Sequence, residues 1–140
     1  MKICIDPGHS GPFEPGACAG GFNEADINWY IAKFAMAELK YRGHQALLTR
    51  GKKIDNDELA FRAECANDWQ ADLFISIHCN SAASIEADGT ETYYYPGSRW
   101  GEQLARCIQF CMTDALLPED RGVKTAGFQV LRGAVCRAVP

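Results

Sequence analysis

Short apolar runs alternate with segments of helical periodicity along most of this chain. Apolar runs bounded by turn residues predict buried strands, and they fall at 2–6, 45–49, 72–77, 90–95 and 128–131. Apolar residues that recur every three or four positions predict helices, and they fall at 23–42, about 57–69 and 98–117. Glycine and proline residues predict a loop over 8–22, and a polar patch predicts a turn over 50–56. This alternation favours an α/β fold with a twisted, mixed but largely parallel sheet flanked by helices.

The first predicted helix has the clearest ends. Asn23 is a suitable N-cap, and the acidic Glu24 and Asp26 follow where the helix dipole favours negative charge. Gly43 provides the C-terminal stop. The helix itself is predicted by the spacing of four apolar residues, Ile27, Tyr30, Ile31 and Phe34.

Composition narrows the class of protein. The chain has 140 residues, of which 47% are hydrophobic and 23% charged, as expected for one globular domain over 1–140. Its net charge of −4 and scattered basic residues argue against nucleic acid as a partner. No apolar stretch approaches the roughly 20 residues that a transmembrane helix needs, and no signal peptide precedes the first strand. Seven cysteines without a CxxC spacing indicate reduced thiols and not a disulfide framework.

Two histidines lie where the predicted sheet would place a functional site. His9 and His78 each follow the carboxyl end of a predicted strand, and α/β sheets bind their ligands at that edge. His44 follows Gly43 in a connecting turn, where helix capping is the simpler interpretation. Two imidazoles and one carboxylate form a recurrent ligand set for catalytic zinc, with one position left open.

The carboxylate has three candidates. Glu24 opens the first helix fifteen residues after His9, and the glycine-rich loop between them allows it to return to the strand end. Its simpler interpretation is a first-turn carboxylate that interacts with the helix dipole. Asp6 is expected to orient the loop or a histidine from outside the ligand set, and Glu14 lies in a predicted mobile loop. Glu24 is therefore the preferred ligand.

Several sequence blocks occur in a characteristic order along the whole chain. They are IDPGHSG at 5–11, PGA at 15–17, NEADIN at 23–28, LLTR at 47–50, Arg62 with AN at 66–67, ADLFISIHCN at 71–80, GTETYYYP at 89–96 and DRGVKTAGFQVLR at 120–132. In these blocks the chain resembles the zinc-dependent N-acetylmuramoyl-L-alanine amidases of bacterial cell walls. So many ordered blocks are far more specific than one short motif.

The resemblance implies a site and a reaction. It implies that His9, Glu24 and His78 are Zn²⁺ ligands and that the substrate is peptidoglycan, cut at the amide between the muramic acid lactyl group and L-alanine. Asn80 is a candidate for binding the stem peptide. We expect Arg50, Arg62 and Asn67 to anchor loops, and we expect strand alternation to point Cys79 away from the metal.

One catalytic group departs from the pattern that the chain resembles. In similar amidases a glutamate that acts as general base follows the VLR segment, whereas this sequence ends at Pro140 a few residues short of that position. We therefore expect this glutamate beyond Pro140 and interpret the 140-residue chain as a truncated catalytic domain.

Alternative functions remain open from the sequence. They are a zinc peptidase acting on another cell-wall amide and a noncatalytic peptidoglycan-binding module. A structural zinc site fits less well, because such sites use four ligands rich in cysteine. Action at the cell wall or periplasm is expected, with synthesis in the cytoplasm before release as a phage or prophage lysin. The oligomeric state and the phage or host origin are not fixed by these patterns.

Overall fold

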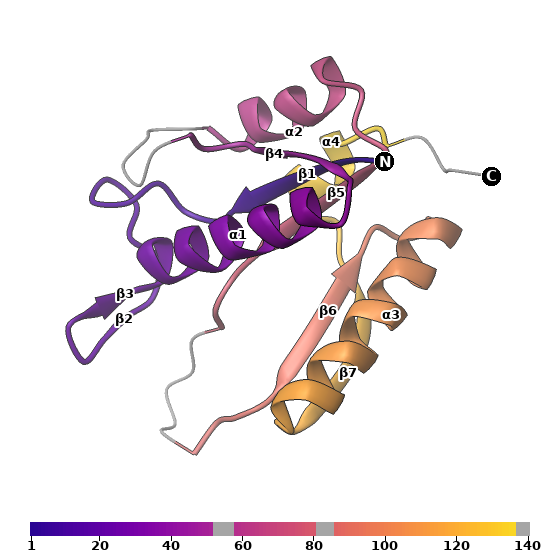
Figure 1. Ribbon diagram of the computed structural model, residues 1–140. Coiled ribbons are helices and arrows are strands. Elements are labelled where there is room, and N and C mark those ends of the chain that lie inside the picture. Colours follow the sequence, from indigo (N-terminus) through magenta and orange to yellow (C-terminus); the bar gives the residue numbers. More distant parts are fainter. Residues whose placement is uncertain (52–57, 81–85, 137–140) are drawn as a thin grey trace. The chain divides into compact units, whose positions relative to one another are not determined.

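The computed structural model describes residues 1–51, 58–80 and 86–136 (Figure 1). The chain forms two compact units, one built from Met1–Ser81 with Gly133–Pro140 and the other from Ala82–Arg132. Residues 52–56 of the predicted turn lie outside the described residues. None of the helices in the described ranges combines the length and the apolar character that a membrane span requires.

The first unit is built on a parallel sheet of three strands, β1 (Lys2–Pro7), β4 (Gln45–Leu48) and β5 (Leu73–Ile77). Strand β1 is central and pairs in parallel with both neighbours. Its side chains alternate between the two faces of the sheet. Ile3 and Ile5 pack with Ala32 of helix α1 (Glu24–Tyr41), whereas Cys4 packs with Ala66 of helix α2 (Leu59–Asp68) and with Ala71. Each face of the strand therefore has its own apolar cluster.

Helix α1 (Glu24–Tyr41) begins and ends as its sequence predicts. The Asn23 side chain accepts a hydrogen bond from the backbone N–H of Asp26 at 2.8 Å, and Gly43 has a φ of +84° just past the end. The apolar residues whose spacing predicted the helix are exposed, Phe34 by 75%. The buried positions are instead the small or polar residues Glu24, Ala25, Asn28 and Ala32. Small side chains allow the helix to approach the sheet closely, and the two polar ones reach toward the strand ends.

The loop predicted over 8–22 contains more structure than expected. Strands β2 (Cys18–Ala19) and β3 (Phe22–Asn23) form a short antiparallel hairpin, so the prediction of an uninterrupted loop is wrong here. Gly20 and Gly21 both have positive φ, at +58° and +82°. Two consecutive residues in that conformation make a tight hairpin turn that matches strand twist, and glycine adopts it without steric cost.

Helix α2 (Leu59–Asp68) lies close to the predicted second helix. It buries Arg62, Ala63 and Ala66, while Leu59 is 43% exposed. The guanidinium of Arg62 therefore occupies an interior position, which the apolar pattern of the sequence does not predict.

The second unit contains two parallel strands, β6 (Thr90–Tyr94) and β7 (Asp120–Thr125), with helix α3 (Arg99–Leu116). The buried Gln109 of α3 joins the strands, because its Nε2 donates to Thr90 O and to Asp120 Oδ1. Strand β6 and helix α3 agree with the predicted elements at 90–95 and 98–117.

The predicted strand at 128–131 is wrong. Helix α4 (Gln129–Gly133) occupies that stretch, and the strand of this region is β7, which the pattern missed. The β7 sequence DRGVKT is polar and largely exposed, so only its pairing with β6 defines it as a strand. The apolar residues of 128–131 bury only Val130, as one face of a short helix does. The α/β class with parallel strand pairing is confirmed.

Candidate metal centre

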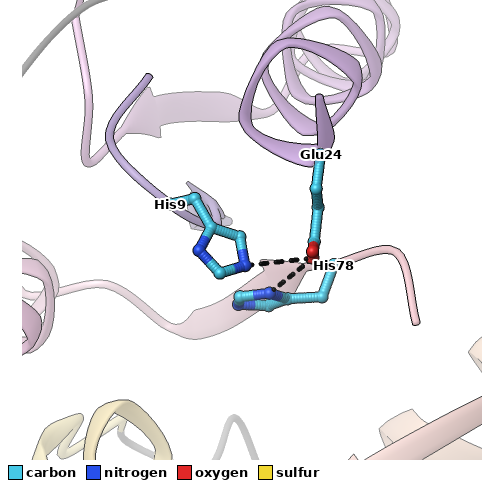
Figure 2. A group of neighbouring side chains, drawn as sticks. All are labelled: His9, Glu24 and His78. Carbon is cyan, nitrogen blue, oxygen red and sulfur yellow. Dashed lines mark hydrogen bonds and ion pairs between the residues drawn. The ribbon is translucent and has the colours of Figure 1, made fainter. Parts of the chain in front are cut away.

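His9, Glu24 and His78 converge at the carboxyl end of the sheet in the first unit (Figure 2). One ligand atom from each side chain lies within 4.8 Å of the others. His9 Nε2 is 3.2 Å and His78 Nδ1 3.0 Å from the same oxygen, Glu24 Oε1. The structure thus brings together the three residues that sequence reasoning selected, and their donor atoms face a common point.

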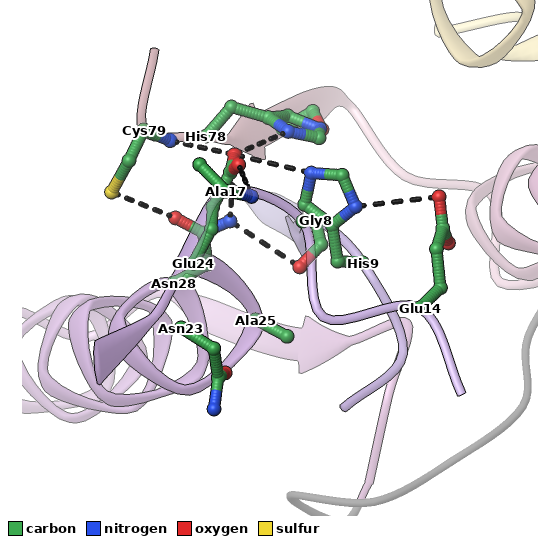
Figure 3. A network of polar contacts seen from close by, with 12 residues as sticks. Gly8, His9, Glu14, Ala17, Asn23, Glu24, Ala25, Asn28, His78 and Cys79 are labelled. Atoms are coloured by element: carbon green, nitrogen blue, oxygen red, sulfur yellow. Dashed lines mark hydrogen bonds and ion pairs between the residues drawn. The ribbon is translucent and has the colours of Figure 1, made fainter. Parts of the chain in front are cut away.

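The sheet and one loop place these side chains. His9 and His78 follow β1 and β5, which are neighbours, and the pairing continues past the strands because Gly8 N donates to Ile77 O at 2.9 Å. The loop before α1 folds onto the helix start, where Glu24 N donates to Ala17 O at 2.8 Å. Glu24 is therefore fixed at the first position of α1, with its carboxylate beside His9, His78 and Cys79 (Figure 3).

Glu24 is buried, with 5% exposure, yet it is held in the anionic form. Burial by itself raises the pKa of its carboxyl. Hydrogen bonds from the backbone N–H groups of Ala17 and Cys79, together with His9 and His78, more than offset burial and hold the pKa below its ordinary value. A buried anion beside two imidazoles is the electrostatic arrangement that a divalent cation requires.

Two glycines leave the room that the imidazoles occupy. A Cβ on Gly16 would lie 2.6 Å from His9 Cδ2 and 2.7 Å from Glu24 Oε2, and a Cβ on Gly8 would overlap the His78 ring. From the sequence, Gly8 and Gly16 are predicted only as loop residues. Their positions within the DPGH and PGA blocks were the available signal.

The ligand set fits zinc. Two imidazoles and one carboxylate are nitrogen and oxygen donors of the kind that catalytic zinc sites use. The His78 side chain is 44% exposed, so the centre is open to solvent on that side. An open side distinguishes a catalytic site from a closed structural one.

The two rival carboxylates have other contacts. Asp6 accepts hydrogen bonds from Thr49 Oγ1 and Ser76 Oγ, both at 2.7 Å, and thereby joins β1 to its neighbours. Asp6 was expected to orient the loop or a histidine; in the described ranges it has no hydrogen bond or ion pair with a histidine, and its link to the loop runs through Arg62, which contacts both Asp6 and Ser10. Glu14 Oε1 lies 3.3 Å from His9 Nδ1, on the ring nitrogen that does not face Glu24.

The remaining candidates divide clearly. Cys79 Sγ points to Asn28 Oδ1 at 3.5 Å and lies outside the metal group, as predicted. Burial, with a further contribution from the Glu24 charge, raises the pKa of this thiol. Asn80 is exposed, and its proposed contact with a stem peptide stays a prediction. His44 also lies outside the metal group.

Three polar side chains anchor loops as expected. Arg50 donates to Ala25 O at 2.9 Å, which ties the start of α1 to the end of β4. Arg62 donates to Ser10 Oγ at 3.2 Å. Asn67 donates to Gly133 O at 2.8 Å and accepts from Val135 N at 2.7 Å. The Arg50 and Arg62 contacts hold the segments next to Glu24 and His9, and Asn67 holds the segment that follows α4.

A group of candidate metal ligands that is open to solvent lies at the strand ends of an α/β fold, and this defines the protein as an α/β protein with a candidate metal site. Comparison with known proteins gives the family. The family model for N-acetylmuramoyl-L-alanine amidase matches residues 3–139, so the chain belongs to that family. It is 40% identical over 136 residues to the N-acetylmuramoyl-L-alanine amidase LytC of Bacillus subtilis (strain 168), covering 93% of this chain and 26% of LytC. It is 36% identical over 149 residues to the endolysin of Bacillus phage SPP1, covering 98% of this chain and 52% of the endolysin. The chain thus spans about a quarter and about half of these two relatives.

The fold is similar to solved amidase structures. The catalytic domain of CwlV, an N-acetylmuramoyl-L-alanine amidase from Bacillus (Paenibacillus) polymyxa var. colistinus, aligns with a TM-score of 0.88 and 30% identity. The alignment covers 98% of this chain and 76% of that structure, so both compact units fall within one known catalytic domain. The predicted family and the single α/β domain are therefore confirmed.

Proposed function

We propose that this chain carries the metal centre of a zinc-dependent N-acetylmuramoyl-L-alanine amidase. The reaction is hydrolysis of the peptidoglycan amide between the lactyl group of N-acetylmuramic acid and L-alanine of the stem peptide. The observation that carries the proposal is the convergence of His9, Glu24 and His78 on one point at an open sheet edge. Membership of the amidase family supports the same reaction.

The residues of the chain have distinct parts in this proposal. His9 Nε2, Glu24 and His78 Nδ1 would hold the ion, which when bound supplies the Lewis acidity that polarises an amide carbonyl and activates water. Glu24 balances the charge of the cation, because backbone N–H groups keep it ionised. The exposed side of His78 leaves an approach for a bulky polymer.

Three further parts are predictions. Asn80, two residues past His78, is proposed to contact the stem peptide. The general base is expected to be a glutamate beyond Pro140. The place of action is expected to be the bacterial cell wall or periplasm, in keeping with a relative named as the endolysin of a Bacillus phage.

The test uses the full natural protein loaded with zinc and incubated with purified muropeptides. We expect free stem peptides that begin with L-alanine, identified by mass spectrometry. Peptides cut at cross-links would instead indicate a zinc peptidase, and binding to sacculi without any release would indicate a noncatalytic binding module. Both of these outcomes contradict the proposal.

A ligand variant sharpens this test. Glu24→Gln keeps the size of the side chain but removes its charge, so we expect zinc affinity and peptide release to fall by more than about 100-fold, beyond the usual effect of an outer contact. The matched control is Glu38→Gln, because Glu38 is an exposed carboxylate of the same helix that forms an ion pair with Arg42 at 2.6 Å, away from the metal group. The control is expected to behave as the wild type.

A further inference from the structure

The backbone of His9 has an unusual conformation. Its φ is +64°, in the left-handed region that a residue with a Cβ adopts at a cost of about 1–2 kcal/mol. Such a conformation persists only where surrounding contacts hold it. The contacts around His9 therefore indicate what fixes the position of this ring.

The two ring nitrogens of His9 face different carboxylates (Figure 3). Nε2 lies 3.2 Å from Glu24 Oε1, within the metal group. Nδ1 is buried and makes no hydrogen bond of regular geometry to the described residues, but Glu14 Oε1 lies 3.3 Å from it. Glu14 is therefore positioned behind the ring, on the side away from the metal group, and not as a ligand.

The buried guanidinium of Arg62 forms an ion pair with Glu14. Arg62 of α2 is 2% exposed, and its Nη2 lies 3.7 Å from Glu14 Oε2 while donating to Ser10 Oγ at 3.2 Å. Its Nη1 lies 3.9 Å from Oδ1 of the buried Asp6. Asp6 is itself fixed by hydroxyl groups from both neighbouring strands. A continuous series of polar contacts thus runs from the centre of the sheet to the His9 ring.

We propose that Glu14 and Arg62 are positioning residues for His9 as a metal ligand. Glu14 is placed to accept a hydrogen bond from Nδ1–H, which leaves the lone pair of the neutral imidazole on Nε2, facing the metal group. The Glu14 side chain is 58% exposed and would rotate freely without a partner, and Arg62 supplies that partner. This inference rests on the proposed function, because it assumes that His9 binds the ion.

The backbone of the turn supports the same geometry. Ser10 N donates to Glu14 O at 3.1 Å and Glu14 N donates to Gly11 O at 3.2 Å, so residues 10–14 form a closed turn. The turn returns Glu14 to His9 although four residues separate them. The earlier expectation of a mobile loop does not describe this turn, whose ends are tied by backbone hydrogen bonds.

The test measures the metal and the ring separately from activity. In the full natural protein, Glu14→Ala should weaken zinc binding by about 10- to 100-fold, as measured by competition with a chelator. Nitrogen NMR of the zinc-loaded protein should show a His9 Nδ1–H that is hydrogen-bonded and slow to exchange with solvent in the wild type, and fast to exchange in Glu14→Ala. Glu14→Gln retains an oxygen that accepts a hydrogen bond, so it should restore part of both properties.

A second variant tests the role of the guanidinium. Arg62→Lys keeps the buried charge but loses the forked geometry, and we expect a zinc affinity between those of the wild type and Glu14→Ala. Glu38→Gln is again the control and should leave both measurements unchanged. Glu14 is half exposed, so its substitution leaves the apolar core intact.

The outcomes separate the two proposals. If the wild type binds zinc and Glu14→Ala binds it equally tightly with an unchanged exchange rate of the His9 Nδ1–H, the positioning role is refuted and the proposed function stands. If the wild type itself does not bind zinc, the proposed function is refuted and the positioning role falls with it.

Discussion

The two compact units of this chain differ most in what they bury. In the part of the first unit that the structure describes, seven polar or charged residues are buried: Asp6, Ser10, Glu24, Asn28, Thr49, Arg50 and Arg62. Among the described residues of the second unit, Gln109 is the one polar residue that is buried as a whole, and the Glu91 side chain is 7% exposed. A buried polar group costs free energy unless it is paired. The first unit therefore bears more of this cost, which agrees with the metal site proposed there.

The second unit uses polar contacts for another purpose. Glu91 pairs with Lys124 and lies 3.6 Å from Arg121, which links β6 to β7. The Tyr93 hydroxyl donates to Glu91 at 3.0 Å, and that hydrogen bond raises the pKa of Tyr93. Each of these partners lies on the two paired strands. The contacts therefore stabilise strand pairing, whereas those of the first unit converge on a site.

The largest expected effect contrasts the buried polar groups of the two units. Asp6→Ala removes the buried carboxylate that lies beside Arg62 and accepts hydrogen bonds from two hydroxyl groups, so we expect a loss of about 3–5 kcal/mol in the free energy of unfolding. Gln109→Ala removes hydrogen bonds to Thr92, Thr90 and Asp120 and should cost about 1–3 kcal/mol. Urea titrations of both variants measure these losses. A larger loss for Gln109→Ala would contradict the contrast between the units.

A smaller effect separates backbone strain from the shape of the site. Gly16 and Gly20 both have positive φ, at +69° and +58°, so alanine at either position should cost about 1–2 kcal/mol in stability. Only the Cβ at position 16 meets His9 and Glu24, while the space around Gly20 is open. We expect Gly16→Ala to lose at least about tenfold in zinc affinity, measured by chelator competition, and Gly20→Ala to keep it. Equal affinities would show that the close approach of Gly16 is not needed.

The smallest effect concerns Cys4, the buried thiol of the first unit. Burial, followed by the charge of Asp6, raises the pKa of Cys4 from 9.0 to about 12. Above pH 9 the unfolded chain therefore loses this proton before the native protein does, and the free energy of unfolding should fall by up to about 1.4 kcal/mol per pH unit. Cys4→Ala should make that decline shallower. The measurement is urea denaturation at several pH values between 8 and 10, and an identical slope in the variant would count against it.

Alkylation provides a direct comparison of this thiol with exposed ones. Cys107 and Cys111 are exposed on α3, whereas Cys4 is fully buried. Iodoacetamide should label both of these thiols of α3 and the exposed Cys18 of the first unit in the native protein, and reach Cys4 only after unfolding. Rapid labelling of Cys4 under native conditions would contradict the buried position of β1.

The sequence determined the features that depend on neighbouring residues. Asn23 and Gly43 define the ends of α1 because a cap and a left-handed stop act within one turn of the helix. The strands that carry His9 and His78 were recognisable as short apolar runs, and the rule for parallel sheets then brought both histidines to one edge. The metal group was predicted because its geometry follows from local patterns joined by one topological rule.

Features that depend on partners distant in the sequence follow only from the folded structure. Strand β7 is defined by its pairing with β6, and no local apolar pattern marks its polar residues. Arg62 is interior because Asp6, Ser10 and Glu14 meet it there, although their separations in sequence range from 48 to 56 residues. Periodicity reports which faces of an element are apolar, but the position of a buried charge is set by the groups that compensate it. Those groups are brought together only when the chain is folded.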